Sequence, residues 1–477
     1  METTLSILLF LLLWGCSTSK PKDPIIEVNK EIAVGNFTKA TEMADSIISK
    51  GTANKDLLRD LRFIQDSLHR VTLDFNKTRE DIVEWIERNQ LCTPSDSLLD
   101  SWEQSKVLEY RVIEGEKRYF RNAAPNIFRV DSSARELSKV SSPTTDLPLD
   151  SLLVDAFNNR INSDTKGKYY LPEKTIKARY RLTVNADAVS NGETVRAWLP
   201  FPREDIRRQT DVKLLATSQD SYLISNDKTA HTSVYMEQRA AEGQPTVFWI
   251  DFEFTSRGEW FDLSQIEVKP YDHNSQLYRT FTSEKKPHIQ FSENIRNLTD
   301  SITQNASSVV ETLQSIYRYI SANFPWASAL EYSTIANIPE YVIEYGKGDC
   351  GQVSLLLITM LRYKGIPARW QSGWMTHPGN VNLHDWAELY IEGTGWIPID
   401  ISFGRGGTLP IEPGREFFMS GIDSYRLYIN SDFSGDFYPP KKYPRSETVD
   451  FQRGEVESDQ WNLYFDRWKY KMELSYK

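Results

Sequence analysis

The chain has 477 residues, too many for one typical domain and enough for about two to four. Hydrophobic residues make up 40% of the chain and aromatic residues 12%, which predicts packed cores and argues against wholesale disorder. The formal net charge is −10 and no basic stripe is present, so a nucleic-acid-binding protein is not expected.

The first residues form an apolar segment that is too short to cross a bilayer. Leu5–Trp14 is almost entirely apolar over about ten residues, whereas a membrane-spanning helix needs roughly twenty. The segment ends at Cys16 and turns polar, and residues 1–16 resemble a bacterial lipoprotein signal peptide with its lipobox. It departs from the usual pattern in having Glu2 and no Lys or Arg before the apolar run.

That resemblance implies export, lipidation of Cys16 and anchoring to the bacterial cell envelope, either in the periplasm or on the cell surface. An ordinary signal peptide or a short membrane-edge anchor is the alternative. Only Cys92 and Cys350 then remain in the body of the chain. A disulfide framework usually needs a larger, even set of cysteines. Counting alone allows a Cys92–Cys350 bridge, but both are predicted to be free thiols.

Residues 24–165 are predicted to form a helical domain that ends in a linker. Apolar residues recur at helical spacing in 31–49 (interrupted at Gly35), 56–73, 78–89 and from Ser95 onward. The turn at Gly35-Asn-Phe resembles the joint of a tetratricopeptide helix pair. The sequence contains no second copy of this pattern, so a repeat array is not predicted. In residues 109–130 the apolar residues recur at both helical and strand-like spacings, which is compatible with a hairpin. The polar residues 132–164 are predicted to be a linker.

In residues 170–287 the spacing of hydrophobic residues changes to the period of two that is typical of strands. Hydrophobic and polar residues alternate in 176–184 and again in 247–254, where four apolar side chains share one face. Turn signals separate these runs. The pattern predicts an antiparallel, sandwich-like β domain.

Residues 288–405 are predicted to form an α+β core. A helix begins near Cys350 and ends at Gly365, and three strands follow at 368–375, 384–391 and 395–401. Residues 406–477 are predicted to be a β-rich C-terminal extension that adds to a sheet or forms a rim over the site. The predicted fold class is therefore a multidomain α+β protein.

A thiol, an imidazole and a carboxylate occur in order within this core. Cys350 lies between glycines at the predicted helix start, where the helix dipole favours a thiolate and a backbone N–H can stabilise an oxyanion. His384 is the predicted general base, and Asp400 on the next strand the group that fixes its tautomer. Strict pairing about the turn would place His384 opposite Phe403, so a stagger or bulge of a few residues is expected. His377 is the rival histidine.

Four motifs carry a family resemblance. They are Gly348-Asp-Cys-Gly351, Lys364-Gly-Ile-Pro-Ala-Arg369, His384-Asp-Trp-Ala-Glu-Leu-Tyr390 and Gly395-Trp-Ile-Pro-Ile-Asp400. Over about residues 300–405 they resemble the core of the transglutaminase-like superfamily. The resemblance implies a papain-like core with Cys350 as nucleophile, His384 as base and Asp400 as orienting acid, and it points to Trp326 as a residue that helps to stabilise the oxyanion.

The resemblance implies an exported cysteine hydrolase that cleaves a peptide or side-chain amide through a thioester on Cys350. Its substrate would be a protein, peptide or glycopeptide, and its membrane contact the lipid anchor. Hydrolysis is favoured over transfer because water is abundant outside the cell. A cross-linking transamidase and a non-catalytic surface binding protein are the alternatives. No cofactor or metal is predicted, since no zinc, phosphate-loop or EF-hand spacing occurs in the sequence.

Overall fold

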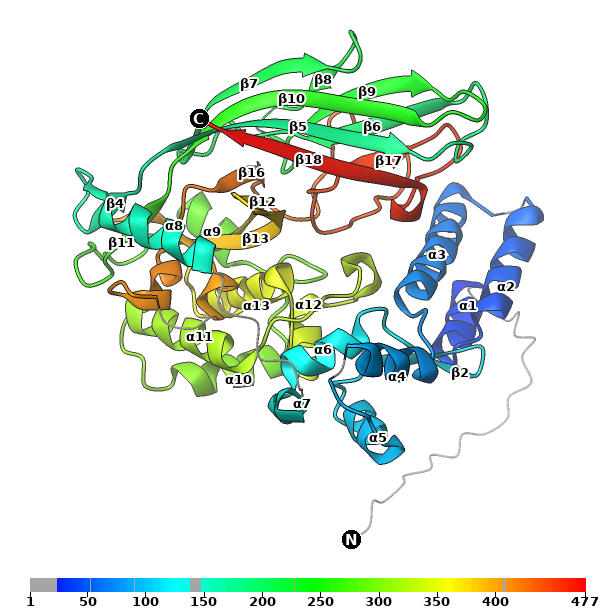
Figure 1. Cartoon of the computed structure of the whole chain (residues 1–477), viewed down its shortest axis with the longest axis horizontal. Helices are drawn as coiled ribbons and strands as arrows, with labels where there is room; N and C mark the ends of the chain where they lie inside the picture. The colour runs from blue at the N-terminus through cyan, green and yellow to red at the C-terminus, as the bar shows by residue number, and fades with distance from the viewer. Residues whose placement is uncertain (1–23, 52, 90, 138–146, 227, 406–408) are drawn as a thin grey trace, which may run out of the picture.

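The computed structural model describes residues 24–51, 53–89, 91–137, 147–226, 228–405 and 409–477. The predicted signal peptide and Cys16 lie outside these residues. The β sandwich lies at the top of the molecule, the mixed core lies below it, and the N-terminal helices lie beside the core at the right and lower right (Figure 1). Within the described ranges, no helix has both the length and the apolar character needed to span a bilayer.

The N-terminal region consists of short amphipathic helices and one hairpin. The helices are α1 (Pro24–Ala33), α2 (Phe37–Ser49), α3 (Lys55–Asp74), α4 (Arg79–Arg88), α5 (Asp96–Gln104) and α6 (Ala123–Val130). Side chains of Asn54, Thr78 and Ser95 cap α3, α4 and α5 by accepting a backbone N–H of the first turn. The hairpin of β1 (Tyr110–Ile113) and β2 (Glu116–Tyr119) lies in the stretch whose mixed periods indicated one.

Part of the predicted linker is helical, and the prediction is wrong there. Helices α7 (Ser132–Leu137) and α8 (Leu147–Asn158) occur within 132–164. Helix α8 buries Leu153, Ala156 and Phe157 at i, i+3 and i+4, a stripe that the polar Asp- and Ser-rich surroundings hid. The Phe157 ring packs edge-on against the core aromatics.

The β sandwich consists of two antiparallel sheets, as the alternation predicted. The sheet of order β18-β5-β10-β7 contains β5 (Lys174–Val184), β7 (Gln209–Thr217), β10 (Thr246–Ser256) and β18 (Trp468–Tyr476). The sheet of order β17-β6-β9-β8 contains β6 (Thr194–Pro200), β8 (Leu223–Ile224), β9 (Ser233–Arg239) and β17 (Glu455–Glu457). The C-terminal segment therefore supplies an edge strand to each sheet, which makes it part of the sandwich.

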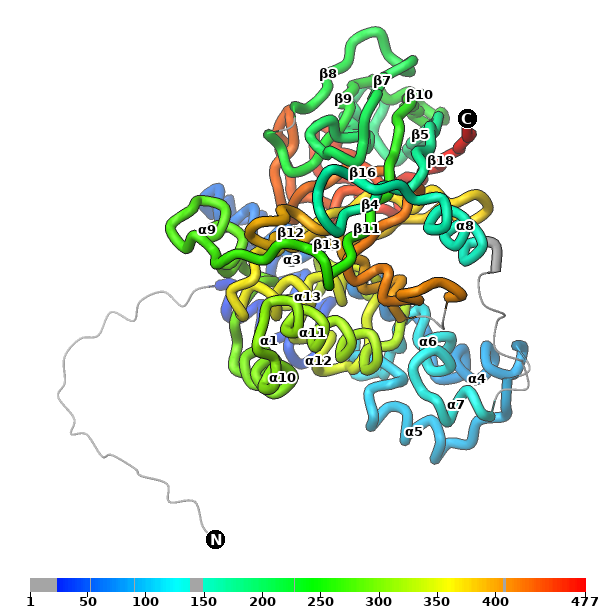
Figure 2. Tube along the Cα trace, turned by 90° about the vertical axis from the view of Figure 1, so that its left-hand side faces the viewer, coloured from blue at the N-terminus to red at the C-terminus, as the bar shows by residue number. Residues whose placement is uncertain are grey.

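A small sheet lies between the sandwich and the core, and further helices surround the central helix of the core. The sheet, of order β15-β11-β4-β3, contains β3 (Ile161–Asn162), β4 (Lys168–Tyr170), β11 (Glu259–Phe261) and β15 (Gly421–Ile422). The helices are α9 (Gln276–Thr282), α10 (Glu293–Thr303), α11 (Val309–Asn323) and α12 (Ile338–Tyr345). A view turned by 90° shows α4, α5, α6 and α7 gathered at one lower corner, away from the sandwich (Figure 2).

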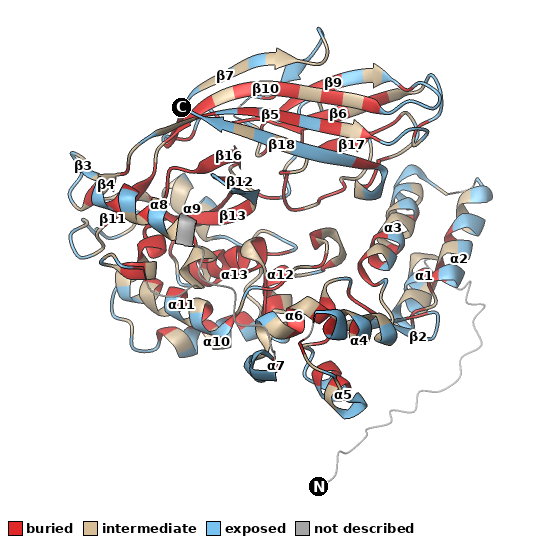
Figure 3. Cartoon of the chain, viewed as in Figure 1, coloured by how far each residue is buried: buried red, intermediate tan, exposed pale blue. Residues whose placement is uncertain are grey.

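The core is built around α13 (Cys350–Tyr363). Every residue from Gly351 to Arg362 is buried, and the helix is almost entirely red when the chain is coloured by burial (Figure 3). It packs on the sheet of order β14-β13-β12-β16, whose strands are β12 (Ala368–His377), β13 (Asn380–Ile391), β14 (Gly395–Ile399) and β16 (Arg426–Asn430). Helices α10, α11 and α12 also contact α13, so a helix apolar on all sides is sheltered on all sides.

Candidate active site

Cys350 is the first residue of α13, and a capping box fixes it there. The Asp349 carboxylate accepts the Gln352 N–H at 3.0 Å, and the Gln352 side chain accepts the Asp349 N–H at 3.2 Å. The Tyr332 hydroxyl donates to the same carboxylate at 2.6 Å. Cys350 thus lies in the first turn, as the sequence predicted, and the two described cysteines are not joined to each other by a disulfide.

The thiol lies on the wall of a cavity of about 230 Å³. Three segments that are distant in the sequence form its walls: 326–332 ahead of α12, 382–385 on β13 and 447–454 in the C-terminal segment. Trp326 is on this wall with 43% of its surface exposed, and its backbone pairs with Gly348 just ahead of the cysteine. The residue proposed for the oxyanion therefore lines the same cavity as the nucleophile.

The hydrogen-bond partner of the thiol is Asp385. The Sγ atom of Cys350 donates to Oδ2 of Asp385 at 3.2 Å, and the Gln452 side chain donates to Oδ1 at 2.7 Å. The glycine after the cysteine makes this contact possible. A Cβ atom on Gly351 would lie 2.7 Å from Oδ2 of Asp385 and closer still to the Tyr332 hydroxyl.

The electrostatic surroundings keep the resting thiol protonated. Burial raises the pKa of Cys350 well above its usual value, and the carboxylates of Asp385 and Asp349 raise it further. Burial and the neighbouring Asp450 also raise the pKa of Asp385. The helix start favours a thiolate at Cys350, as expected, but burial and two carboxyl groups oppose it here.

His384 and Asp400 are hydrogen-bonded to each other. Nε2 of His384 lies 2.7 Å from Oδ2 of Asp400. Residues 387–391 pair with 395–399 in unbroken register, and continuing this ladder would place residue 386 opposite 400. Asp400 is therefore a diagonal neighbour of His384 on the same face of the sheet, within reach of its side chain. The expected stagger or bulge is replaced by this diagonal contact.

A chain of buried charges continues from Asp400. Burial opposes ionisation of this carboxyl, but His384 and Arg426 outweigh burial and lower its pKa. Arg426 lies 2.9 Å from Asp400 and also pairs with Asp423, which in turn lies 3.0 Å from Nε2 of His377. Burial lowers the pKa of His384, so its ring is neutral and donates from Nε2 to the ionised Asp400.

Cys350 and His384 make their contacts on opposite faces of β13. Consecutive side chains of a strand alternate between its two faces. Asp385 faces α13 and contacts the thiol, so His384 faces the other side, where its ring stacks on Trp386 with the centroids 5.7 Å apart. The structure thus brings His384 to Asp400, and it gives Cys350 a partner that sequence reasoning missed.

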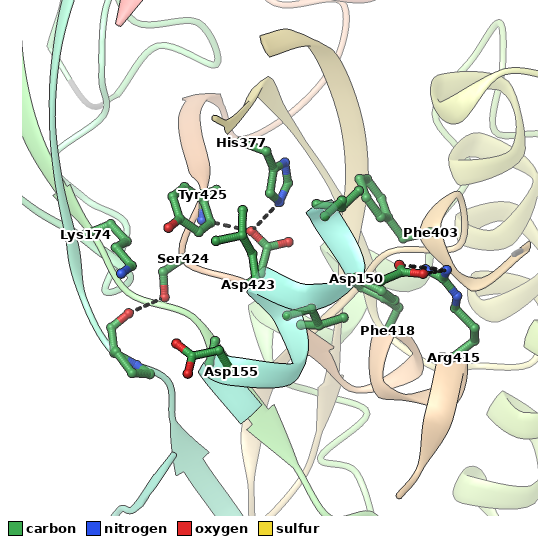
Figure 4. Close-up of a pocket in the computed structure, with 15 residues that line it drawn as sticks. Asp150, Asp155, Lys174, His377, Phe403, Arg415, Phe418, Asp423, Ser424 and Tyr425 are labelled. Carbon is green, nitrogen blue, oxygen red and sulfur yellow. Dashed lines mark hydrogen bonds and ion pairs between the residues drawn. The ribbon is translucent and has the colours of Figure 1, made fainter. Parts of the chain in front are cut away.

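His377, the rival histidine, belongs to a different cavity. It lines a space of about 30 Å³ together with Asp423, Tyr425 and Phe403, under helix α8 (Figure 4). Phe403 separates this space from the ring of His384, against which it packs edge-on with the centroids 4.9 Å apart. His377 is therefore linked to the His384–Asp400 pair through Asp423 and Arg426, away from the thiol.

The fold and the site define an α+β domain with a cysteine at the start of its central helix. The family comparison is consistent with this: residues 296–401 match the model of the transglutaminase-like superfamily, so the chain contains a transglutaminase-like core domain. Among curated proteins, the chain is 24% identical over 173 residues to the uncharacterized protein YebA of Bacillus subtilis (strain 168). This match covers 32% of the chain and 23% of YebA, so the chain spans about a quarter of that relative.

Two solved structures can be aligned with parts of this chain, both at low sequence identity. A candidate cysteine protease from Cytophaga hutchinsonii is 14% identical with a TM-score of 0.42, covering 65% of this chain and 92% of that one. The periplasmic domain of TgpA from Pseudomonas aeruginosa is 13% identical with a TM-score of 0.26, covering 69% and 92%.

Proposed function

We propose that the protein is a cysteine-dependent amide hydrolase whose nucleophile is Cys350. One observation carries this proposal: the thiol begins α13 on the wall of a 230 Å³ cavity and donates to a buried carboxyl group at 3.2 Å. A thiol in this position can attack a carbonyl group that enters the cavity, and the adjacent carboxylate of Asp385 can take its proton.

The reaction follows from these contacts. Sγ attacks the amide carbon while its proton passes to Asp385, and the carbonyl oxygen becomes an oxyanion. As the first residue of a helix, Cys350 has a backbone N–H without an intrahelical acceptor, which can donate to that oxyanion. Collapse of this tetrahedral intermediate breaks the carbon–nitrogen bond and leaves a thioester on Cys350. The departing amine takes the proton back from Asp385. Water then hydrolyses the thioester to an acid and the free thiol.

His384, oriented by Asp400, is the second candidate for the proton-accepting role, which the family resemblance assigns to it. The direct contact between Asp385 and the thiol favours Asp385 as the proton acceptor, because the His384 side chain lies on the opposite face of β13. The substrate is proposed to be a peptide or side-chain amide of a protein, peptide or glycopeptide.

Acid-quenched mass spectrometry tests the proposal. The protein is incubated with a set of N-acylated peptide p-nitroanilides and glutamine-containing peptides, and the peptide that contains Cys350 is examined for an acyl adduct. We expect the adduct and release of amine, both lost in Cys350→Ala and both kept in the matched control Cys92→Ala. Amine release that survives Cys350→Ala would contradict the proposal.

A labelled primary amine in the same reaction distinguishes hydrolysis from transfer. We expect the acid product to dominate, because water reaches the thioester without a dedicated site. Preferential incorporation of the amine into the acyl donor would support the transamidase alternative.

We further propose, from residues 1–16, that the protein is exported and held at the bacterial cell envelope by a lipid on Cys16. In cells grown with a labelled fatty acid, the protein is expected to carry the label and to sediment with membranes. Cys16→Ser is expected to lose the label and to appear in the soluble fraction. Label that persists in this variant would contradict the assignment.

A further inference from the structure

Two loops that flank the thiol are held by the N-terminal helical region. The first, here called the cysteine loop, is residues 345–349 directly before Cys350. The second, here called the wall loop, is residues 324–332, which carries Trp326 and Tyr332 into the cavity. The helical region borders the core next to α12, so both loops lie at this boundary (Figure 1).

A buried ion pair holds the cysteine loop. Nζ of Lys347 lies 3.3 Å from Oε2 of Glu109, and both side chains are less than 5% exposed. The Tyr341 hydroxyl donates to the same carboxylate at 2.7 Å. Burial lowers the pKa of Lys347 and Glu109 opposes this, as expected where one carboxylate compensates a buried ammonium group. Glu109 comes from the segment between α5 and β1, so a residue of the helical region fixes a position three residues before the nucleophile.

Helix α6 holds the wall loop from the same side. The Asn126 side chain donates to the Ser328 carbonyl and accepts the Ser328 N–H, each at 2.9 Å. Arg129 donates to the Ser328 hydroxyl at 2.8 Å, and its guanidinium lies 4.9 Å from the centre of the Trp326 ring. Asp74, at the end of α3, accepts the Glu331 N–H at 2.8 Å. These contacts bind backbone as well as side chains, so they set where the loop runs.

The two loops meet at the helix start. The Tyr332 hydroxyl of the wall loop donates to Asp349, the capping residue that precedes Cys350. A shift of either loop therefore moves the first turn of α13 relative to Asp385, which is fixed on β13. The helical region contributes none of the residues that line the cavity, yet it holds both loops that do.

We propose that the helical region positions the thiol: the Glu109–Lys347 pair and the Asn126–Ser328 contact set the spacing of the two loops and so keep Cys350 against Asp385. Glu109 and Asn126 are positioning residues, since neither touches the cavity. The proposal rests on the proposed function only for its catalytic consequence, because the placement of the thiol can be measured without any turnover.

The experiment measures alkylation of Cys350 by iodoacetamide in the full chain across pH, read by mass spectrometry and normalised to N-acetylcysteine in the same mixture. In the native protein the protonated thiol is expected to react slowly at pH 7.5. Glu109→Gln leaves Lys347 without its carboxylate, so the cysteine loop relaxes and Cys350 leaves Asp385. We expect alkylation at pH 7.5 to rise about tenfold, with the midpoint of the pH profile moving down by about one unit.

A matched control comes from the same boundary. Lys106 and Glu344 form an exposed ion pair at 2.6 Å, with about half of each side chain in contact with solvent. Glu344→Gln removes this interregion pair without leaving a buried charge, and it leaves Lys106 over the ring of Tyr345 in the cysteine loop, so alkylation is expected to stay within twofold of the native rate. An equal change in Glu344→Gln and Glu109→Gln would overturn the proposal, because it would show general loosening of the boundary.

Asn126→Ala keeps the test decisive if Glu109→Gln does not fold, since it acts on the wall loop and buries no unpaired charge. We expect alkylation of Cys350 at pH 7.5 to rise in this variant as well, by about threefold. A lowered thermal midpoint with an unchanged alkylation profile in the folded variants would overturn the proposal and leave only ordinary packing. If alkylation shifts while native and variant proteins alike release no amine, the positioning role stands and the hydrolase proposal fails.

Discussion

At the scale of single residues, Asp385 determines how the thiol is expected to react. A cysteine paired with an imidazolium reacts as a preformed thiolate, whereas Cys350 donates its proton to a carboxyl group whose own pKa is raised by burial and Asp450. The raised pKa makes the ionised form of Asp385 a stronger base than an exposed carboxylate and narrows the difference between its pKa and that of the thiol. Asp385 can act as this base only when its hydrogen-bonded neighbour Asp450 holds the proton between the two carboxyl groups. Proton transfer is then expected to accompany attack on the substrate.

Asp385→Asn tests this assignment. Loss of the proton acceptor is expected to lower kcat/KM for amide release by about 10²- to 10⁴-fold, while the alkylation midpoint of Cys350 falls because a neighbouring carboxylate is gone. The matched variant is His384→Asn, one residue away on the opposite face, with a smaller expected loss of activity. Full activity in Asp385→Asn together with an inactive His384→Asn would give the base role to His384.

The buried carboxyl group of Asp74 is expected to make the stability of the protein depend on pH. Burial raises its pKa from 3.8 to about 6, although Arg121 and the Glu331 N–H oppose the shift. A raised pKa in the folded state stabilises the protein below about pH 4, and this stabilisation is lost as the pH rises through about 6. The full effect is on the order of 3 kcal/mol.

Asp74→Asn is therefore expected to be more stable than the native protein at pH 7 and to lose this advantage at pH 4, as read from thermal midpoints. Its amide oxygen can still accept the Glu331 N–H. Asp56→Asn, an exposed position in the same helix, serves as control and is expected to show no such trend. A stability difference for Asp74→Asn that is constant across this range would refute the buried-carboxyl explanation.

At the scale of elements, the start of α13 depends on the absence of a side chain at Gly351. The space beside it is filled by Tyr332 and Asp385. Gly351→Ala is expected to push these groups away, to lower stability by about 1–3 kcal/mol and to remove amide release. Gly348→Ala is the milder control, because a Cβ there would meet nothing closer than 3.2 Å. Chemical unfolding and the alkylation assay measure both effects, and a native-like Gly351→Ala would contradict the tight packing.

The sequence indicated most elements of the core because their signals are local. The helix start at Cys350, the strand at 384–391 and the turn between that strand and the next each depend on residues a few positions apart. The partner of the thiol depends on which face of β13 meets α13, and this is a tertiary property. A signal was present nonetheless: Asp385 shares its face with Ala387, Leu389 and Ile391, so a charged residue stood at the end of an apolar row.

Other elements were missed for physical reasons. Helix α8 has an apolar stripe of only a few residues in polar surroundings, and it becomes stable by packing its aromatic residue on the core. Pairing of directly opposite residues alone predicts an irregular register for the His384–Asp400 contact. A diagonal neighbour on the same face reaches just as well for long side chains.

At the scale of the whole molecule, the predicted core 288–405 is not a complete functional unit. Asp450 and Gln452 come from the C-terminal segment and β16 completes the core sheet, while the helical region holds both loops. A fragment of residues 288–405 is expected to lack the cavity and a cooperative thermal transition. A chain of residues 24–477 is expected to keep both, as measured by circular dichroism and alkylation of Cys350. A folded, slowly alkylated short fragment would contradict this dependence.

The C-terminal strands have a consequence for biosynthesis. Strands β16, β17 and β18 enter three different sheets, and β18 pairs along its own whole length with residues 176–184 of β5, which is made far earlier. On the ribosome, one edge of β5 therefore stays unpaired until β18 has been made, and Asp385 lacks its contact with Gln452 until that residue has been made. A chain that stops before β18 is expected to expose this strand edge and to be prone to aggregation.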